Sequence, residues 1–148
     1  MLVADSENDR VLVWTTFPTV SGQSADYAIP VTNYVSMGDS WPWGVWSNGE
    51  KTVITATVAE TILFWNNFPG PTTPPDLTLQ SSQIGRPRSI ISNGDYVMIG
   101  DENAAGPCSG VNGNRSTHVF TSWPTSSKDP DACVEQWVSG VIDNGKIY

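Results

Sequence analysis

The chain has one histidine and two cysteines in 148 residues, which leaves little for a transition-metal site or an active site with several histidines. His118 alternates with apolar neighbours in an expected strand. The sequence nominates no nucleophile or metal partner for it, so a partly buried structural histidine is favoured over a catalytic base. Cys108 and Cys133 lack the C-x-x-C spacing that would support a metal or redox role. A disulfide between them would indicate a secreted or periplasmic setting, and two free cytosolic thiols are the alternative.

Carboxylates provide a second kind of candidate site. Asp5 and Asp101 stand at corresponding places in acidic, oxygen-rich loops, which suit calcium better than zinc. Asp5 occurs together with Arg10, so a structural ion pair or backbone cap is the favoured interpretation and calcium the alternative. No other cofactor is expected, and no catalytic residue is nominated.

Aromatic and basic side chains provide the third. Trp41 and Trp43 lie beside polar loops and could stack on a sugar or a peptide. Arg86 and Arg88 flank Pro87 and could bind an anionic ligand bidentately. Packing of the tryptophans between structural units, and pairing of the arginines with nearby acids, are the structural alternatives.

Charge and hydropathy exclude some classes of partner. The net charge is −8, from 15 acidic and 7 basic residues, so a nucleic-acid partner is not expected. No apolar run approaches the roughly 20 residues of a membrane span. With 39% hydrophobic residues in 148, the chain is long enough for one domain with a sizeable core.

The elements that must position these residues are short strands. The chain has 13 glycines and 11 prolines, and β-branched and aromatic residues lie between its turns, which favours an all-β fold. An aromatic-proline corner recurs three times, at 14–18 (WTTFP), 65–69 (WNNFP) and 120–124 (FTSWP). A short strand precedes each corner, and an acid follows it at Asp26, Asp76 and Asp131. Asn-Gly turns recur at 48–49, 93–94 and 144–145, each after another strand.

One repeat therefore contains four antiparallel strands, which is typical of a β-propeller blade. The two ends of the chain belong to one repeat: IDNGKIY joined to LVADSENDRVLVW aligns without a gap to residues 46–65. The whole chain, 1–148, is expected to be one half-propeller domain. Its first blade is split between 138–148 and 2–34, its second spans about 41–80, and its third about 86–136.

Three blades cannot close a ring of ordinary curvature, and open strand edges invite pairing. We expect a C2 homodimer with six blades, in which the C-terminal inner strand of each chain completes the N-terminal blade of the other. A half cut from a longer six-bladed protein, with Met1 as an added initiator, is a compatible alternative.

The stretch LVADSENDRVLVW at 2–14, with the F-P and A-D-Y-A-I that follow it, resembles the NHL repeat. The likeness is close only in the first blade. Ala56 and Thr61 replace the motif's Asp and Arg in the second blade, and Ser116 replaces the Arg in the third, which also carries an insertion of about ten residues. The resemblance implies a propeller that acts as a binding scaffold. Some relatives are lyases or lactonases with a metal in the central channel.

Function follows less directly than fold. The leading hypothesis is a non-enzymatic propeller binding module or scaffold for a carbohydrate or peptide. A calcium-dependent hydrolase or lyase at the channel is the alternative, although the expected inner strands are poor in ligands. A fragment with no activity of its own is the third possibility.

Overall fold

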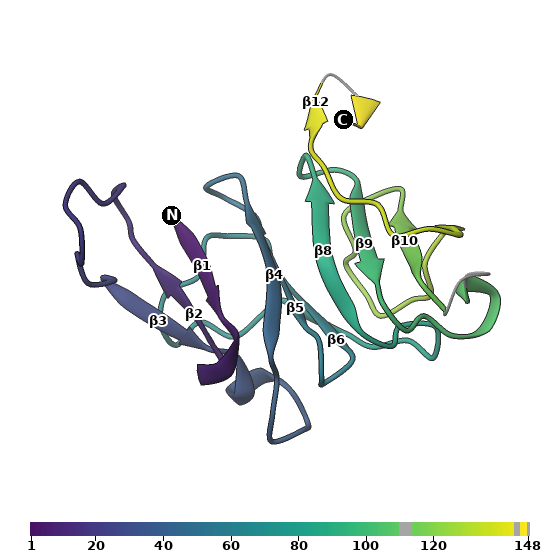
Figure 1. Cartoon of the computed structure of the whole chain (residues 1–148), viewed down its shortest axis with the longest axis horizontal. Coiled ribbons are helices and arrows are strands. Elements are labelled where there is room, and N and C mark those ends of the chain that lie inside the picture. Colours follow the sequence, from purple (N-terminus) through teal and green to yellow (C-terminus); the bar gives the residue numbers. More distant parts are fainter. Residues whose placement is uncertain (110–113, 144–145, 148) are drawn as a thin grey trace.

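The computed structural model describes residues 1–109, 114–143 and 146–147, and it is all-β (Figure 1). Three antiparallel sheets follow one another along the chain. The first has the order β1-β2-β3, the second β4-β5-β6-β7, and the third β8-β9-β10-β11. Each sheet is built from consecutive strands joined by short turns, as in a meander. A two-stranded hairpin, β12-β13, follows the third sheet.

The strands are short. The first sheet comprises β1 (Leu2–Asp5), β2 (Arg10–Val13) and β3 (Tyr27–Pro30). The second comprises β4 (Pro42–Ser47), β5 (Thr52–Ala56), β6 (Thr61–Trp65) and β7 (Leu77–Leu79). The third comprises β8 (Pro87–Ser92), β9 (Val97–Asp101), β10 (Ser116–Phe120) and β11 (Ala132–Val134). The hairpin is β12 (Ile142–Asp143) with β13 (Lys146–Ile147), and single 3-10 turns lie at η1 (Ser6–Asn8), η2 (Val31–Tyr34) and η3 (Gly106–Cys108).

The sheets pack face to face, and the middle sheet is buried on both sides. Successive side chains of a strand point to opposite faces. On β6, Leu63 and Trp65 enter one core cluster with residues of the first sheet. Ile62 and Phe64 enter a second cluster with residues of the third sheet. This two-sided burial explains why β6 reads as a continuous apolar run.

The Asn-Gly turns at 48–49 and 93–94 have the same construction. In each turn the Asn Oδ1 accepts the backbone N–H groups two and three residues further on, at 2.8–3.0 Å. Gly49 and Gly94 have φ of +93° and +94°, which favours glycine. The Asn residues do not share that conformation: the glycine alone supplies the positive φ in these loops. The third expected turn, at 144–145, lies outside the described residues.

The C-terminal hairpin differs from the repeat. Ser47 pairs with Thr52 across the turn of the second sheet, which would align Asp143 with Tyr148. Instead Asp143 pairs with Lys146 and Ile142 with Ile147. The first sheet thus has three described strands where the second and third have four.

Candidate functional site

Two aspartates hold the segments that lead into β4 and β8. The Asp9 Oδ1 accepts hydrogen bonds from the backbone N–H of Ser40 and of Trp41, both at 2.8 Å. The Asp101 carboxylate accepts those of Gly85 at 2.8 Å and Arg86 at 2.7 Å. Ser40-Trp41 and Gly85-Arg86 occupy equivalent places in the repeat. The two aspartates therefore fix the backbone of the predicted tryptophan–arginine site.

These hydrogen bonds lower the pKa of both carboxyl groups. Burial alone would raise the pKa of Asp101, but hydrogen bonds from His118 and from three backbone N–H groups hold that pKa below its ordinary value. Burial also opposes ionisation of Asp9, and the N–H groups of Trp41 and Ser40 outweigh it, so its pKa is lowered as well. Both groups are carboxylates at neutral pH, acting as acceptors for the loops.

A cation–π cluster lies on β4 and β8. The Arg88 guanidinium stacks on the Trp43 ring at 4.3 Å from its centroid and faces the Trp137 ring at 5.9 Å. Arg88 also forms an ion pair with Glu102, whose other oxygen is 3.9 Å from Arg115. Arg88 is therefore committed to neighbours within the protein, as the structural alternative expected.

Trp41 and Arg86 have a different environment. Together with Asp39, Thr57 and Arg88, they line a hollow of about 310 Å³. The Trp41 side chain is 42% exposed, and Arg86 is exposed. Among the described residues, no carboxylate forms an ion pair with Arg86. The hollow is therefore lined by the partly exposed Trp41 and by an arginine, Arg86, that has no ion-pair partner among the described residues.

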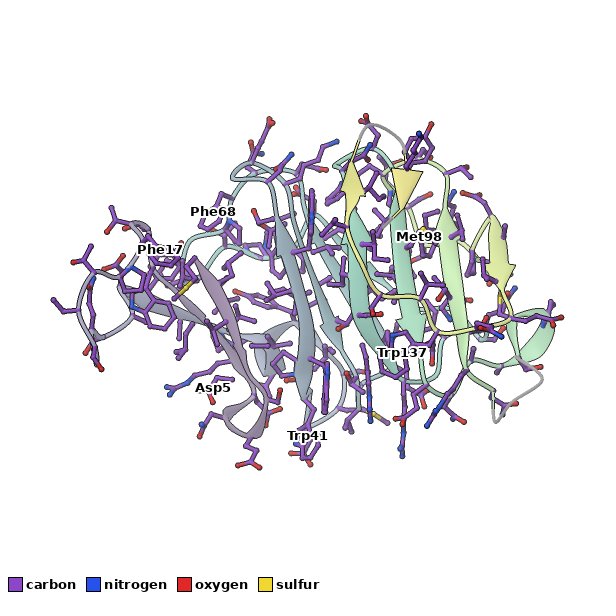
Figure 2. The ribbon with its side chains drawn as sticks, turned by 45° about the horizontal axis from the view of Figure 1, so that its top comes forward. Asp5, Phe17, Trp41, Phe68, Met98 and Trp137 are labelled. Carbon is purple, nitrogen blue, oxygen red and sulfur yellow. A yellow bond between two sulfur atoms is a disulfide. The ribbon has the colours of Figure 1, made fainter. Side chains whose placement is uncertain are left out.

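The four residues predicted to bind a ligand thus divide into two pairs. Trp43 and Arg88 form the stacked cluster, whereas Trp41 and Arg86 line the hollow, which Arg88 borders as well. Figure 2 shows Asp5, Trp41 and Trp137 in the lower half of the view, with Phe17 and Phe68 in the upper half.

Asp5 and Asp101, the proposed calcium ligands, belong to different sheets. The Asp5 carboxylate accepts bonds from Arg10 and Asn8, both at 2.8 Å, which is the favoured ion pair. In the described part of the chain, neither Asp5 nor Asp101 belongs to a cluster of three or more potential metal ligands. Calcium binding at these positions stays a prediction.

Cys108 and Cys133 form a disulfide with a Cα–Cα distance of 5.4 Å. The bond ties η3 to the outer strand β11. Such a bond fits an oxidising environment. His118 is fully buried in β10, beyond the partial burial expected, and its Nε2 lies 3.0 Å from Asp101 Oδ2.

Sequence reasoning missed three residues that shape this region: Asp9, Glu102 and Trp137. A signal existed for one of them, because the gapless repeat alignment places Trp137 at the position of Trp41. Asp9 carries no such signal. Asp9 binds the backbone before β4 of the second sheet. The second sheet has Ala56 at the position that Asp101 occupies in the third sheet, so it has no carboxylate of its own there.

Comparisons with protein-family models, curated proteins and solved structures give no match. The NHL resemblance therefore stays a prediction from the residues. Within the described residues, no helix has the length and apolar character needed to cross a membrane.

Proposed function

We propose that this chain is half of a six-bladed β-propeller that pairs with a second copy and serves as a non-enzymatic binding module. One observation carries the proposal. Among the described residues the first sheet has three strands where the second and third have four, and the sequence that aligns with the absent inner strand lies at 140–143.

The register of the second sheet specifies how this strand would pair. There Val45 lies opposite Ile54, and Trp46 opposite Val53. Transferred through the gapless alignment, the register places Val141 opposite Val3 and Ile142 opposite Leu2. Val3 is 40% exposed and Val141 62% exposed in the single chain. Pairing these two valines would remove both from water.

The path of the C-terminal segment supports this assembly. After β11 the chain returns to the inner side of the third sheet (Figure 1). Trp137 Nε1 donates to Ser89 Oγ at 2.8 Å, and Ser89 Oγ donates to the Val138 carbonyl at 3.2 Å. The segment thus lies against β8 where the inner strand of a following blade is expected.

Light scattering across a dilution series tests the assembly. The native chain should give twice the chain mass of 16.0 kDa. The variant Val3→Lys should give a monomer, since a lysine on the strand edge opposes pairing. Val134→Lys is the matched control, because Val134 is equally exposed but lies on β11. A native monomer at every concentration would refute the dimer.

For the binding function, we propose an acidic saccharide at the hollow between Trp41 and Arg86. A sugar ring can stack on the exposed indole, and its carboxylate can bind the free guanidinium. His118, the sole histidine, is fully buried, so no imidazole is available at this surface as a general base. The disulfide supports an extracellular or periplasmic location for such a module.

Calorimetric titration with oligogalacturonates and with neutral cello-oligosaccharides tests the ligand class. We expect binding of the acidic series only. Arg86→Gln should weaken this binding at least about tenfold, the scale of a lost charge-assisted hydrogen bond. Trp41→Ala should also weaken it, because the stacking surface is lost. Phe17→Ala, an exposed aromatic elsewhere, should have no effect. Binding of acidic peptides instead would reassign the ligand, and equal binding of both sugar series would exclude a role for Arg86.

A further inference from the structure

The buried His118 has one ring nitrogen without a partner. The Asp101 carboxylate can only accept, so the Nε2 that it contacts at 3.0 Å carries the hydrogen. Nδ1 is buried and has no hydrogen-bond partner among the described residues. Buried polar atoms are nearly always satisfied, so such an orphan requires an explanation.

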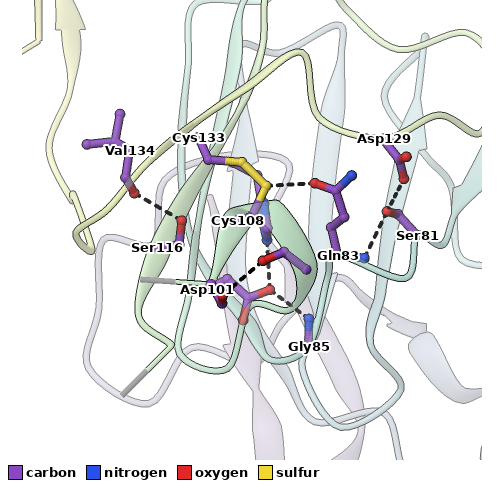
Figure 3. Close-up of a disulfide and its surroundings, with 12 residues drawn as sticks. Ser81, Gln83, Gly85, Asp101, Cys108, Ser116, Asp129, Cys133 and Val134 are labelled. Carbon is purple, nitrogen blue, oxygen red and sulfur yellow. Dashed lines mark hydrogen bonds and ion pairs between the residues drawn. A yellow bond between two sulfur atoms is a disulfide. The ribbon is translucent and has the colours of Figure 1, made fainter. Parts of the chain in front are cut away.

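The disulfide supplies two sulfur atoms beside this imidazole. On β11, Cys133 lies directly opposite His118 of β10, and η3 brings Cys108 to the same place. The two Sγ atoms and a ring nitrogen of His118 all lie within 4.8 Å of one another. Figure 3 shows the two cysteines beside Asp101 and Gln83. Two thiolates and one imidazole are a typical donor set for Zn²⁺.

Asp101 completes the arrangement seen around metal-binding histidines. Such a histidine usually gives its other ring N–H to a carboxylate, which fixes the ring and raises the basicity of the ligating nitrogen. Asp101 stands in that position, and three backbone N–H groups hold it there, those of Gly85, Arg86 and Asn103. Nδ1 of His118 is therefore free to bind a metal ion, and the Asp101 carboxylate holds the ring through its Nε2.

We propose that the reduced form of this protein binds Zn²⁺ through Cys108, Cys133 and His118. A dithiol supplies two electrons and two protons as it is oxidised to its own disulfide, and these convert the protein disulfide into two thiols. A phosphine supplies the two electrons and takes the oxygen of a water molecule to become the phosphine oxide, while that water provides the two thiol protons. Zinc then displaces both thiol protons and binds the thiolates and the imidazole nitrogen. The disulfide and the metal site are alternative states of the same residues.

The geometry needs only side-chain movement. Zn–S bonds of about 2.3 Å in a tetrahedron place the two sulfurs about 3.8 Å apart. The sulfurs must separate from bonding distance, and rotation of the cysteine side chains supplies this. The Oε1 of Gln83 lies 2.8 Å from Cys108 Sγ and is available for the fourth position, which water would otherwise fill.

Titration with Co²⁺, a spectroscopic substitute for zinc, tests the site. We expect the phosphine-reduced protein to bind one equivalent, with the intense visible bands of tetrahedral Co²⁺ and a thiolate charge-transfer band, all abolished by excess Zn²⁺. The oxidised protein is the matched control and should show none of these bands. Cys108→Ser and Cys133→Ser should each remove the charge-transfer band or weaken Co²⁺ binding at least 100-fold.

The role of His118 is tested without substituting it, because His118 is buried and its replacement could prevent folding. In the reduced protein loaded with ¹¹³Cd, the shift should indicate two sulfurs and one nitrogen, with coupling to ¹⁵N of His118. Asp101→Asn should weaken Zn²⁺ affinity by about 10–100-fold. No stoichiometric metal binding by reduced protein, or cobalt bands that survive in the double cysteine-to-serine variant, would overturn the proposal.

Discussion

At the scale of residues, one aspartate per sheet stabilises each aromatic-proline corner. The carboxylate of this aspartate, just before the outer strand, accepts a hydrogen bond from a backbone N–H group of the corner. The donor is the residue directly after the first aromatic residue of the corner. The pairs are Asp26 with Thr15, Asp76 with Asn66 and Asp131 with Thr121, at N···O distances of 2.7, 2.7 and 2.8 Å. The repeated acid noted in the sequence is therefore a backbone cap.

Asp131 provides a pH test of this role. Hydrogen bonds from Lys128, and then from Thr121, lower its pKa to about 2 from 3.8. Because the folded pKa is the lower one, the contribution is present above pH 3.8 and is lost as the pH falls toward 2. We expect Asp131→Asn to cost about 0.5–1 kcal/mol at pH 7, since the group is exposed, and much less near pH 2.

Urea unfolding at several pH values measures this difference. Asp95→Asn makes the same charge change in an exposed turn and should leave stability within about 0.5 kcal/mol of the parent at each pH. If Asp131→Asn were as neutral as Asp95→Asn at pH 7, the capping role would be excluded.

At the scale of elements, the second and third sheets come into close contact at Gly44, where β4 meets β8. A Cβ atom on Gly44 would lie 2.0 Å from the Arg88 carbonyl oxygen and 2.9 Å from Thr55 Oγ1. The Thr55 hydroxyl joins the strands: it accepts from Gly44 N–H at 2.8 Å and donates to the Arg88 carbonyl at 2.9 Å. The absence of a side chain at Gly44 thus allows the close approach of the second and third sheets.

Gly44→Ala should destabilise the fold by about 1–3 kcal/mol, because the strand or its neighbour must shift to admit the methyl group. Gly38→Ala is the control, since nothing lies within 4 Å of its added Cβ. That change should be neutral or slightly stabilising. Urea midpoints that are equal for the two variants would contradict the close contact.

At the scale of the whole molecule, strand β1 at the edge of the first sheet lies far in space from strand β12 near the C-terminus (Figure 1). The N-terminus lies on the first sheet, and strand β12 lies beyond β8 of the third sheet (Figure 1). An intramolecular pairing of β1 with 140–143 would require the arc of sheets to close on itself. Pairing between two chains leaves the arc unchanged and requires only that the short hairpin β12-β13 give up its present register.

A cysteine pair tests the register of that pairing. In the double variant Val3→Cys and Val141→Cys, directly opposed residues would have Cα atoms about 4.5–5.5 Å apart, within disulfide range. Mild oxidation should give a covalent dimer on a non-reducing gel. The control, Val3→Cys with Val134→Cys, should remain monomeric on the same gel. Equal cross-linking of both variants would contradict the transferred register.

Much of the fold was predictable because its signals are local. The alternation around His118, the Asn-Gly turns and the aromatic-proline corners each depend on residues close in sequence. They correctly predicted an all-β chain and the four-strand order of the second and third sheets. The six-bladed closure and the homodimer stay predictions, because they depend on a second chain.

The sites were less predictable because they combine distant segments. Arg88 could be nominated from its neighbours, but its partners Trp43, Glu102 and Trp137 come from different strands and loops. Asp9 holds Ser40 and Trp41 from 31 and 32 residues away. No short-range pattern predicts hydrogen bonds of that separation.

By itself, the sequence determined the strands, the turns and the repeat, since backbone preference and side-chain alternation act over a few residues. The tertiary structure decided which chemical groups meet. The two cysteines lack C-x-x-C spacing, and the sequence nominated no metal partner for His118, yet strand pairing sets His118 opposite Cys133, and η3 adds Cys108. Antiparallel pairing joins residues at any separation along the chain, so only the folded sheet could bring these three together.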